Sequence, residues 1–345
     1  MSAMLRRTAA RRPALAARLA TTAVVAAILA GCGGGGGGDD SGAPVVPSAA
    51  TITASNYEGV ARQTLVATTY LGDATGLVTG AQVAPGAQTL FAYTRSQIGR
   101  LPGLFASRTP LVTGVTSTET FNCTGGGSIS VQTTDNNGNN SVDVGDSATV
   151  TARSCVEEGA TISGAITLSF SAVSGNLNTD TYAATVAVSL QELRASTQAG
   201  NATGSGQFTL AISSTSTSTN LDLSVPNLSV TGSFGGIQDT VTMADYRMTS
   251  TAGLSGGRQR VSTTVSGVVG STVLAGGTVN LATVSPLVQF EGDLHPSGGQ
   301  ITATGAAGSR VRLTAQSPVT VLLELDADGN GAYETSLTKT WSSLV

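Results

Sequence analysis

The sequence predicts a mainly β protein: a large antiparallel sheet, or a two-sheet sandwich, with a short N-terminal helical segment (α+β). From about residue 117 onward, apolar residues recur at every second position, and the positions between them hold Thr, Ser or other small residues. This alternation is typical of strands with one buried face and one wet face. Only 11% of the residues are charged and 40% are hydrophobic, so the chain can bury a core and is not disordered throughout.

The composition divides the chain into four segments. Residues 1–31 form a signal segment, residues 32–50 a Gly-rich tether, residues 51–115 a helical segment that packs on the sheet, and residues 116–345 the antiparallel β domain. The run Gly33–Gly38 has no strand before it and no Lys-Ser or Lys-Thr after it. It is therefore interpreted as a flexible tether and not as a phosphate-binding loop.

The leader carries five arginines and no acidic residue, and residues 19–30 form an apolar stretch. A stretch this short cannot span a bilayer, which needs about 20 residues, so a cleaved signal peptide is predicted. The stretch ends in Leu29-Ala30-Gly31-Cys32. This motif resembles the lipobox of bacterial lipoproteins, and the resemblance implies cleavage before Cys32, palmitate-type acyl chains on Cys32 and a permanent membrane anchor. Gly33 after the cysteine, by the same resemblance to proteobacterial lipoproteins, implies the outer membrane of the cell envelope.

Removal of the leader takes five arginines with it and changes the formal net charge from −4 to −9. An acidic chain with a single lysine, Lys339, is a poor partner for nucleic acid or for an anionic lipid surface. No nucleic acid partner is therefore expected. The expected partners are the membrane, through the lipid, and either an envelope protein or an apolar ligand.

Two amphipathic helices are predicted in the helical segment. Apolar residues lie at nearly helical spacing over residues 60–71 and again over residues 90–101, where Pro102-Gly103 is expected to end the second helix. Neither helix has a basic polar face, so both are expected to pack on the sheet and not on a membrane.

Alternation of apolar residues with Ser and Thr predicts several strands of the β domain. The apolar positions of these strands are expected to share one face: Gly164, Ile166, Leu168, Phe170, Ala172; Tyr182, Ala184, Val186, Val188, Leu190; Phe208, Leu210, Ile212; Leu221, Leu223, Val225; Val319, Val321, Leu323 and Leu325. The Gly, Asn and Asp residues between such runs mark the hairpin turns.

Cys123 and Cys155 remain when Cys32 is lipidated, and in an oxidising envelope they are expected to form a disulfide. A bridge of this span stabilises the fold by roughly 3–4 kcal/mol on the chain-entropy model. Two free buried thiols are the alternative. The two cysteines flank an acidic loop at similar distances, so the bridge is expected to close the base of a hairpin that has this loop as its tip.

The acidic loop between the cysteines is the first candidate metal site. Calcium prefers six to eight hard oxygen ligands, which side chains at alternate positions of a tight loop can supply. The spacing resembles the ligand spacing of the EF-hand loop, with Asn140 in place of the usual Gly, a final Asp in place of Glu, and strands in place of the flanking helices. The alternative is an Asx-rich hairpin turn without a metal. The candidate ligands are Asp135, Asn137, Asn139, Asp143 and Asp146.

The second candidate calcium site lies near the end of the chain, and its ligands would be Asp326, Asp328, Asn330 and Glu334. The spacing resembles the calcium loops between strands of integrin-type β-propeller repeats, although it occurs only once in this chain. Asp-Gly and Asn-Gly are also strong hairpin signals, so a metal-free turn is the alternative. Calcium in either loop is expected to stabilise a turn and not to take part in catalysis, and no other cofactor is predicted.

No catalytic residue is predicted. Residues 253–257 match the G-x-S-x-G pattern, but a nucleophile elbow needs a strand, a sharp turn and a helix, and the residues from Arg258 onward are typical of another strand. The single histidine, His295, lies in a predicted loop and is interpreted as a surface residue. The chain is therefore interpreted as a non-enzymatic protein.

Cys123 with its three following glycines, the Asn-rich acidic loop, Cys155 and the late Asp-Gly-Asn-Gly turn before Trp341 together resemble uncharacterised β-rich lipoproteins of proteobacteria. This resemblance implies no activity, and three hypotheses stay open. The chain is a structural or partner-binding envelope module, or a carrier or sensor of an apolar ligand held by a curved sheet under the helices, or a carboxylate-dependent hydrolase. The carrier needs a cavity lined by the alternating apolar residues, whereas the first hypothesis expects these residues to be fully packed.

Overall fold

The computed structural model describes residues 48–75, 85–106, 115–157, 159–177, 179, 181–198, 200–234 and 237–344. The predicted leader, Cys32 and nearly all of the Gly-rich tether lie outside the described residues. All of the helices and strands below belong to one unit, Val46–Val345.

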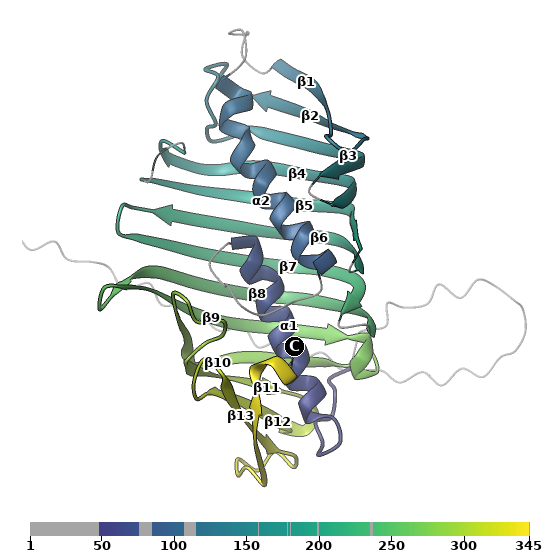
Figure 1. Cartoon of the computed structure of the whole chain (residues 1–345), viewed down its shortest axis with the longest axis vertical. Helices are drawn as coiled ribbons and strands as arrows, with labels where there is room; N and C mark the ends of the chain where they lie inside the picture. The colour runs from purple at the N-terminus through teal and green to yellow at the C-terminus, as the bar shows by residue number, and fades with distance from the viewer. Residues whose placement is uncertain are drawn as a thin grey trace, which may run out of the picture. The chain divides into compact units, whose positions relative to one another are not determined.

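Fourteen strands of the described residues form a single antiparallel sheet, so the single-sheet form of the predicted fold is the one present (Figure 1). Every strand pairs with its neighbours in the chain, so the order in the sheet is the order in the sequence. The strands are β1 Val115–Asn122, β2 Ser128–Asp135, β3 Ser147–Glu157, β4 Ala160–Gly175, β5 Tyr182–Thr197, β6 Gly200–Ser214, β7 Ser218–Phe234, β8 Ile237–Ser255, β9 Arg258–Ser271, β10 Thr278–Phe290, β11 Gly298–Thr304, β12 Arg310–Ala315, β13 Thr320–Asp326 and β14 Thr335–Thr340.

Two α-helices, α1 (Tyr57–Thr75) and α2 (Pro85–Ala106), lie on one face of this sheet, which we call the inner face (Figure 1). α2 packs on β4–β7, and α1 packs on β8, β9 and β11–β13. The ring of Phe91 on α2 lies 6.3 Å from the ring of Phe208 on β6. Three 3-10 turns, η1 (Thr272–Leu274), η2 (Ala306–Gly308) and η3 (Trp341–Ser343), lie after β9, after β11 and after β14.

The prediction that the second helix ends at Pro102 is wrong, because α2 continues through this proline to Ala106. A proline inside a helix removes one backbone hydrogen bond, which local packing can offset. Leu101 and Phe105 on either side of it are completely buried. Burial of these two side chains in the core therefore holds the last turn in place.

Bulges paired with glycines run across the sheet. At each of several bulges, a glycine with positive φ lies against the backbone of the neighbouring strand, where a Cβ atom would collide. Three of the bulges contain a non-glycine residue in the left-handed region: Ser154 with φ 47°, Glu192 with φ 45° and Asp245 with φ 46°. Bulges bend the strands that contain them. The pairs are Gly164 with Glu192, Gly206 with Asn227, Gly267 with Asp245 and Gly299 with Pro286.

The helices pack over this line of bulges. Gly204 on β6 lies so close to α2 that an added Cβ would meet Leu90 at 3.4 Å. Tyr246, which follows the bulge residue Asp245, is 1% exposed and lies next to Thr68 of α1. The bends therefore bring the sheet into close contact with both helices.

Candidate functional site

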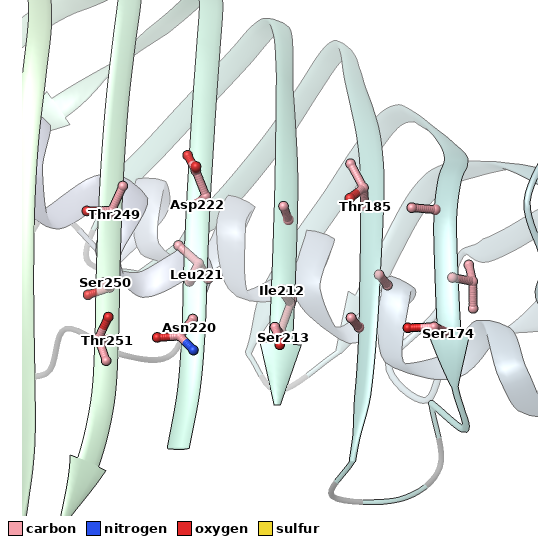
Figure 2. Close-up of a pocket in the computed structure, with 15 residues that line it drawn as sticks. Ser174, Thr185, Ile212, Ser213, Asn220, Leu221, Asp222, Thr249, Ser250 and Thr251 are labelled. Atoms are coloured by element: carbon pink, nitrogen blue, oxygen red, sulfur yellow. The ribbon is translucent and has the colours of Figure 1, made fainter. Parts of the chain in front are cut away.

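The face of the sheet opposite the helices, which we call the outer face, contains a hollow of about 470 Å³ across β4–β8 (Figure 2). The alternation of the strands places its side chains on this face. Leu221 and Leu223 are buried on the inner face, so Asp222 between them faces outward. Likewise, Ala211 lies between the buried Leu210 and Ile212, which is partly buried against the core, and Thr249 lies between the buried Met248 and Ser250.

Two parallel rows of outward-facing residues line the hollow (Figure 2). Within each row, consecutive residues are direct cross-strand partners. The backbone of the row between them forms the floor, because its side chains face the helices. The first row consists of Ala172, Thr185, Ala211, Asp222 and Thr249, and the second of Ser174, Ala183, Ser213, Asn220 and Thr251.

Small side chains in the middle of the rows leave the hollow open, and polar groups form its wall on the β7–β9 side. Arg247 donates from Nε to Oδ1 of Asp222 at 3.0 Å, and this hydrogen bond raises the pKa of Arg247 above its usual value. Thr249 and Thr264 share a hydrogen bond of 2.6 Å. The hollow therefore offers hydroxyl, amide and carboxylate groups at the fixed spacings of a sheet.

A second hollow of about 510 Å³ lies on the same face over β8–β10 and shares Thr249 with the first. Its far side is formed by Val284, which is 62% exposed, and Pro286, at a bulge in β10. A third hollow, of about 490 Å³, lies over β3–β5 and is lined by Thr151, Gln191 and Arg194 among others. All three hollows lie on the outer face.

The inner face is filled. Most of the apolar residues expected on one face are buried there together with residues of both helices in one hydrophobic core. Ala172 is an exception that corrects the predicted alternation: a bulge between Phe170 and Ala172 shifts the register, so Ala172 lines the outer hollow. Val319 is a second exception, because it precedes β13 and is 63% exposed.

The first acidic loop connects β2 to β3, and its carboxylates accept backbone amides. Asp135 is 5% exposed and accepts N–H groups from Gly138 at 2.6 Å and from Asn140 at 2.8 Å. Asp146 is completely buried and accepts N–H groups from Asn136 at 2.8 Å and from Asp143 at 2.7 Å. Asp143 accepts side-chain amides from Asn137 at 3.1 Å and from Asn139.

The second acidic loop, between β13 and β14, repeats this hydrogen-bond pattern. Asp326 ends its strand as Asp135 does, and it accepts the amides of Gly329 at 2.8 Å and Gly331 at 2.9 Å. The amide of Asn330 donates to Asp328 at 3.1 Å, as that of Asn139 donates to Asn137 at 3.0 Å. Gly138 and Gly329 both have φ 73°. The two loops, which the sequence matched to different calcium motifs, therefore share one conformation.

The two loops differ in how closely their acidic oxygens converge. Oxygens of Asp326, Asp328 and Glu334 lie within 4.8 Å of one another. Among the described residues, Asp135, Asp143 and Asp146 do not form such a group. The second loop thus has the closer set of ligands for a cation, with Asn330 beside them, although Arg310 already donates to Asp326 at 2.8 Å.

Opposite pKa shifts at the two buried aspartates follow from these surroundings. Burial raises the pKa of Asp146, and the nearby Asp135 and Asp143 add to this, against the amides of Asn136 and Asp143. At Asp326 burial also acts to raise the pKa, but the amides of Gly331 and Gly329 and the charge of Arg310 outweigh it, so the pKa lies below its usual value.

Cys123 and Cys155 form a disulfide with a Cα–Cα distance of 5.4 Å. The expected position of this bridge is wrong in one respect. Cys123 follows β1 and does not lie on a strand flanking the acidic loop, so the bridge joins the β1–β2 turn to β3. The amide of Gly125 also donates to Val156 in this region at 2.9 Å. The disulfide and the acidic loop lie at opposite ends of β3.

The G-x-S-x-G match lies in a hairpin turn, since Ser255 ends β8 and β9 begins at Arg258. His295 is not a free surface residue: its ring stacks on Trp341 at 5.7 Å, and burial lowers its pKa. The sequence did not indicate this stacking, nor the two rows of the outer hollow, because both depend on which strands and loops become neighbours.

Among the described residues, neither helix is long and apolar enough to span a bilayer. Comparison with protein-family models, with curated proteins and with solved structures finds no match. The case for a function therefore depends on the geometry of the chain itself.

Proposed function

We propose that this chain is a lipid-anchored, non-enzymatic protein of the outer membrane that binds a partner in the cell envelope through the outer face of its sheet. The difference between the two faces of the sheet is the observation that carries this proposal. The inner face is closed by α1 and α2, whereas the outer face carries hollows lined by Thr, Ser, Asn and small residues.

The chemistry of the outer face suits recognition by hydrogen bonds. Neighbouring strands are about 4.8 Å apart, and side chains on one face of a strand repeat at about 6.8 Å, so the hydroxyls of the hollow lie at fixed positions between the alanines of the two rows. A rigid site loses little conformational freedom on binding. The Arg247–Asp222 pair adds one charged contact beside the row of hydroxyls. An extended polar partner fits this array better than a small apolar ligand does.

The carrier hypothesis is not favoured by the packing. A carrier needs free volume among the alternating apolar residues, but residues such as Leu168, Val188 and Leu223 are at most 2% exposed and belong to the core shared with the helices.

The anchor is proposed from the lipobox at Cys32. Cys32→Ser is expected to abolish incorporation of labelled palmitate and to release the protein from the membrane fraction, and retention of the label would exclude this anchor.

Photo-crosslinking in the native envelope tests the contact surface. A photoreactive residue at Ala211, in the centre of the main hollow, is expected to give a discrete adduct. The matched control position is Thr231, which is exposed on the same face but lines none of the three hollows. Ala211→Arg should abolish the adduct formed by a photoreactive residue at Thr185. Equal labelling from positions 211 and 231, or no adduct from the hollow, would overturn the proposal.

A further inference from the structure

β1 is an edge strand with a regular ladder on one side only. All eight of its residues pair with β2 in an unbroken register. Cys123, the next residue, donates its N–H to Gly127 and accepts from Gly126, so its backbone groups point toward β2. Because backbone direction alternates along a strand, the N–H and C=O groups of the even-numbered residues point away from β2. These residues are Thr116, Thr118, Thr120 and Asn122.

In the part of the chain that the structure describes, the outward edge of β1 is unpaired. Among the described residues, no backbone hydrogen bond joins Thr116, Thr118, Thr120 or Asn122 to another part of the chain on this side. The side chains of all four residues are exposed. Unpaired edge groups are a template for pairing with another strand.

The other edge of the sheet is protected in the usual ways. β14 has only six residues, and its Lys339 forms an ion pair of 2.9 Å with Glu58 of α1. Short length and an edge lysine both discourage strand pairing. β1 has eight residues, no lysine, no proline and no bulge. The edge that lacks these devices is therefore the one available for a partner strand.

We propose that β1 pairs antiparallel with β1 of a second copy of this chain, with Thr118 opposite Thr118 across a twofold axis. The two sheets then continue into each other. This proposal concerns the edge and is independent of the function proposed for the outer face.

The side chains of β1 select this register. Residues that face each other across an antiparallel pair lie on the same face, so the allowed registers differ by two residues. With Thr118 on the axis, Thr116 lies opposite Thr120, and Glu119 lies opposite Ser117. Three pairs of outward-pointing residues then exchange about six hydrogen bonds. Thr–Thr pairs across strands are favourable.

The neighbouring register is disfavoured by charge. A shift by two residues that places Glu119 on the axis puts the two Glu119 carboxylates directly opposite each other, and like charges in this position are destabilising. A shift by two residues in the other direction places Ser117 on the axis. Only the two Thr116–Thr118 pairs of outward-pointing residues then lie within β1. A shift by four residues, with Thr120 on the axis, avoids opposed carboxylates but replaces two of the three Thr–Thr pairs with Thr118–Asn122 pairs. The register with Thr118 on the axis is therefore the one that keeps all three Thr–Thr pairs without opposing the two Glu119 carboxylates.

Cysteine crosslinking of the full-length chain in its own envelope tests this register. Thr118→Cys alone is expected to give a covalent dimer with a short thiol-specific crosslinker. Thr116→Cys alone is not, because its two copies would lie roughly 14 Å apart along the strands. Co-expression of Thr116→Cys with Thr120→Cys should restore the dimer. Crosslinking of Thr116→Cys alone at the level of Thr118→Cys, or no dimer from Thr118→Cys, would overturn the proposal.

A proline at the same position tests the role of the backbone. Thr118→Pro removes an N–H that points away from β2, so the fold should persist while the purified chain changes from twice the monomer mass to the monomer mass in light scattering. Thr118→Val keeps the N–H and should remain a dimer. A wild-type chain that is monomeric, or that forms dimers insensitive to Thr118→Pro, or that pairs β1 with a different protein, contradicts the proposal.

Discussion

Asp135 and Asp326 occupy the same place in two loops at opposite edges of the sheet. Each ends a strand, is at most 5% exposed and accepts backbone amides from the turn that follows it, two at Asp135 and three at Asp326. A buried carboxylate is costly unless it is hydrogen-bonded, so these amides explain why both aspartates can be buried. The same arrangement leaves the exposed oxygens of the loops, such as those of Asp328 and Glu334, available to a cation.

Calcium is expected to raise the melting temperature of the protein relative to chelator. A site filled at one hundred times its Kd adds about 2.7 kcal/mol, which corresponds to several degrees in a protein of this size. Asp326→Asn with Glu334→Gln should remove the larger part of the shift, and Asp135→Asn with Asp143→Asn the remainder. Asp222→Asn, outside both loops, serves as the control. Equal melting temperatures in calcium and chelator would exclude both sites.

His295 and Trp341 provide a built-in reporter, because each is the only residue of its type in the chain. Burial lowers the pKa of His295 below 6.5. The folded state therefore binds fewer protons at this site than the unfolded state just below pH 6.5. The resulting contribution to stability is complete above that pH and is lost as the pH falls through the folded pKa.

Tryptophan fluorescence should reveal this titration. Protonation of the stacked imidazole is expected to change the emission of Trp341, with a midpoint below pH 6.5, and His295→Gln should remove the transition. A midpoint at or above pH 6.5 would show that burial does not control the proton affinity of this histidine.

At the scale of the elements, the bulge–glycine pairs determine how the strands meet the helices. Gly267 on β9 has φ 122°, and a Cβ there would lie 2.6 Å from the carbonyl oxygen of Asp245. Gly256, in the β8–β9 turn, also has positive φ, 60°, but a Cβ there would meet nothing within 4 Å. The two glycines therefore differ in their surroundings: Gly267 lies against the backbone of the neighbouring strand, whereas Gly256 does not.

Gly267→Ala is expected to destabilise the protein by about 3 kcal/mol or more, because both the conformation and the collision oppose the new side chain. Gly256→Ala should cost about 1 kcal/mol, which reflects the left-handed conformation alone. Denaturant unfolding of the two variants measures the difference. If both lose the same stability, the bulges do not depend on close backbone contact.

At the scale of the whole unit, the two faces of the sheet have different roles. The inner face supplies the buried apolar surface on which the helices pack, and this surface provides most of the driving force for folding. The outer face keeps its Thr and Ser residues in water, where they contribute little to the core but remain available for contacts. Substitutions on the two faces should therefore separate stability from binding.

The strands under the helices could be predicted from the sequence because period-two alternation reflects burial directly, as at Leu168 and Phe170. The shift at Ala172 could not, because a bulge moves the register without any change in residue type. The outer hollow was missed for a related reason. Its rows consist of one residue from each of five strands, so residues such as Ala211 and Asp222 become neighbours only after the strands pair.

The disulfide pair could be predicted because only two cysteines remain after Cys32, but its place in the fold depends on where β1 ends. The end of α2 could not be predicted from Pro102, because tertiary packing decides there: Leu101 and Phe105 are buried on both sides of the proline. The spacing of Asp and Asn residues predicts the two candidate calcium loops. Their common conformation could not be predicted in this way, because it depends on hydrogen bonds from backbone amides to Asp135 and Asp326.

The order of the strands has a consequence for how this domain could change over evolutionary time. Because each strand pairs only with its sequence neighbours, the sheet behaves as a linear array with nearest-neighbour interactions, as repeat proteins do. Duplication or deletion of one hairpin would leave every other pairing intact and would widen or narrow the sheet by two strands. The number of strands can thus change without a change in topology, up to the width of sheet that the two helices can cover.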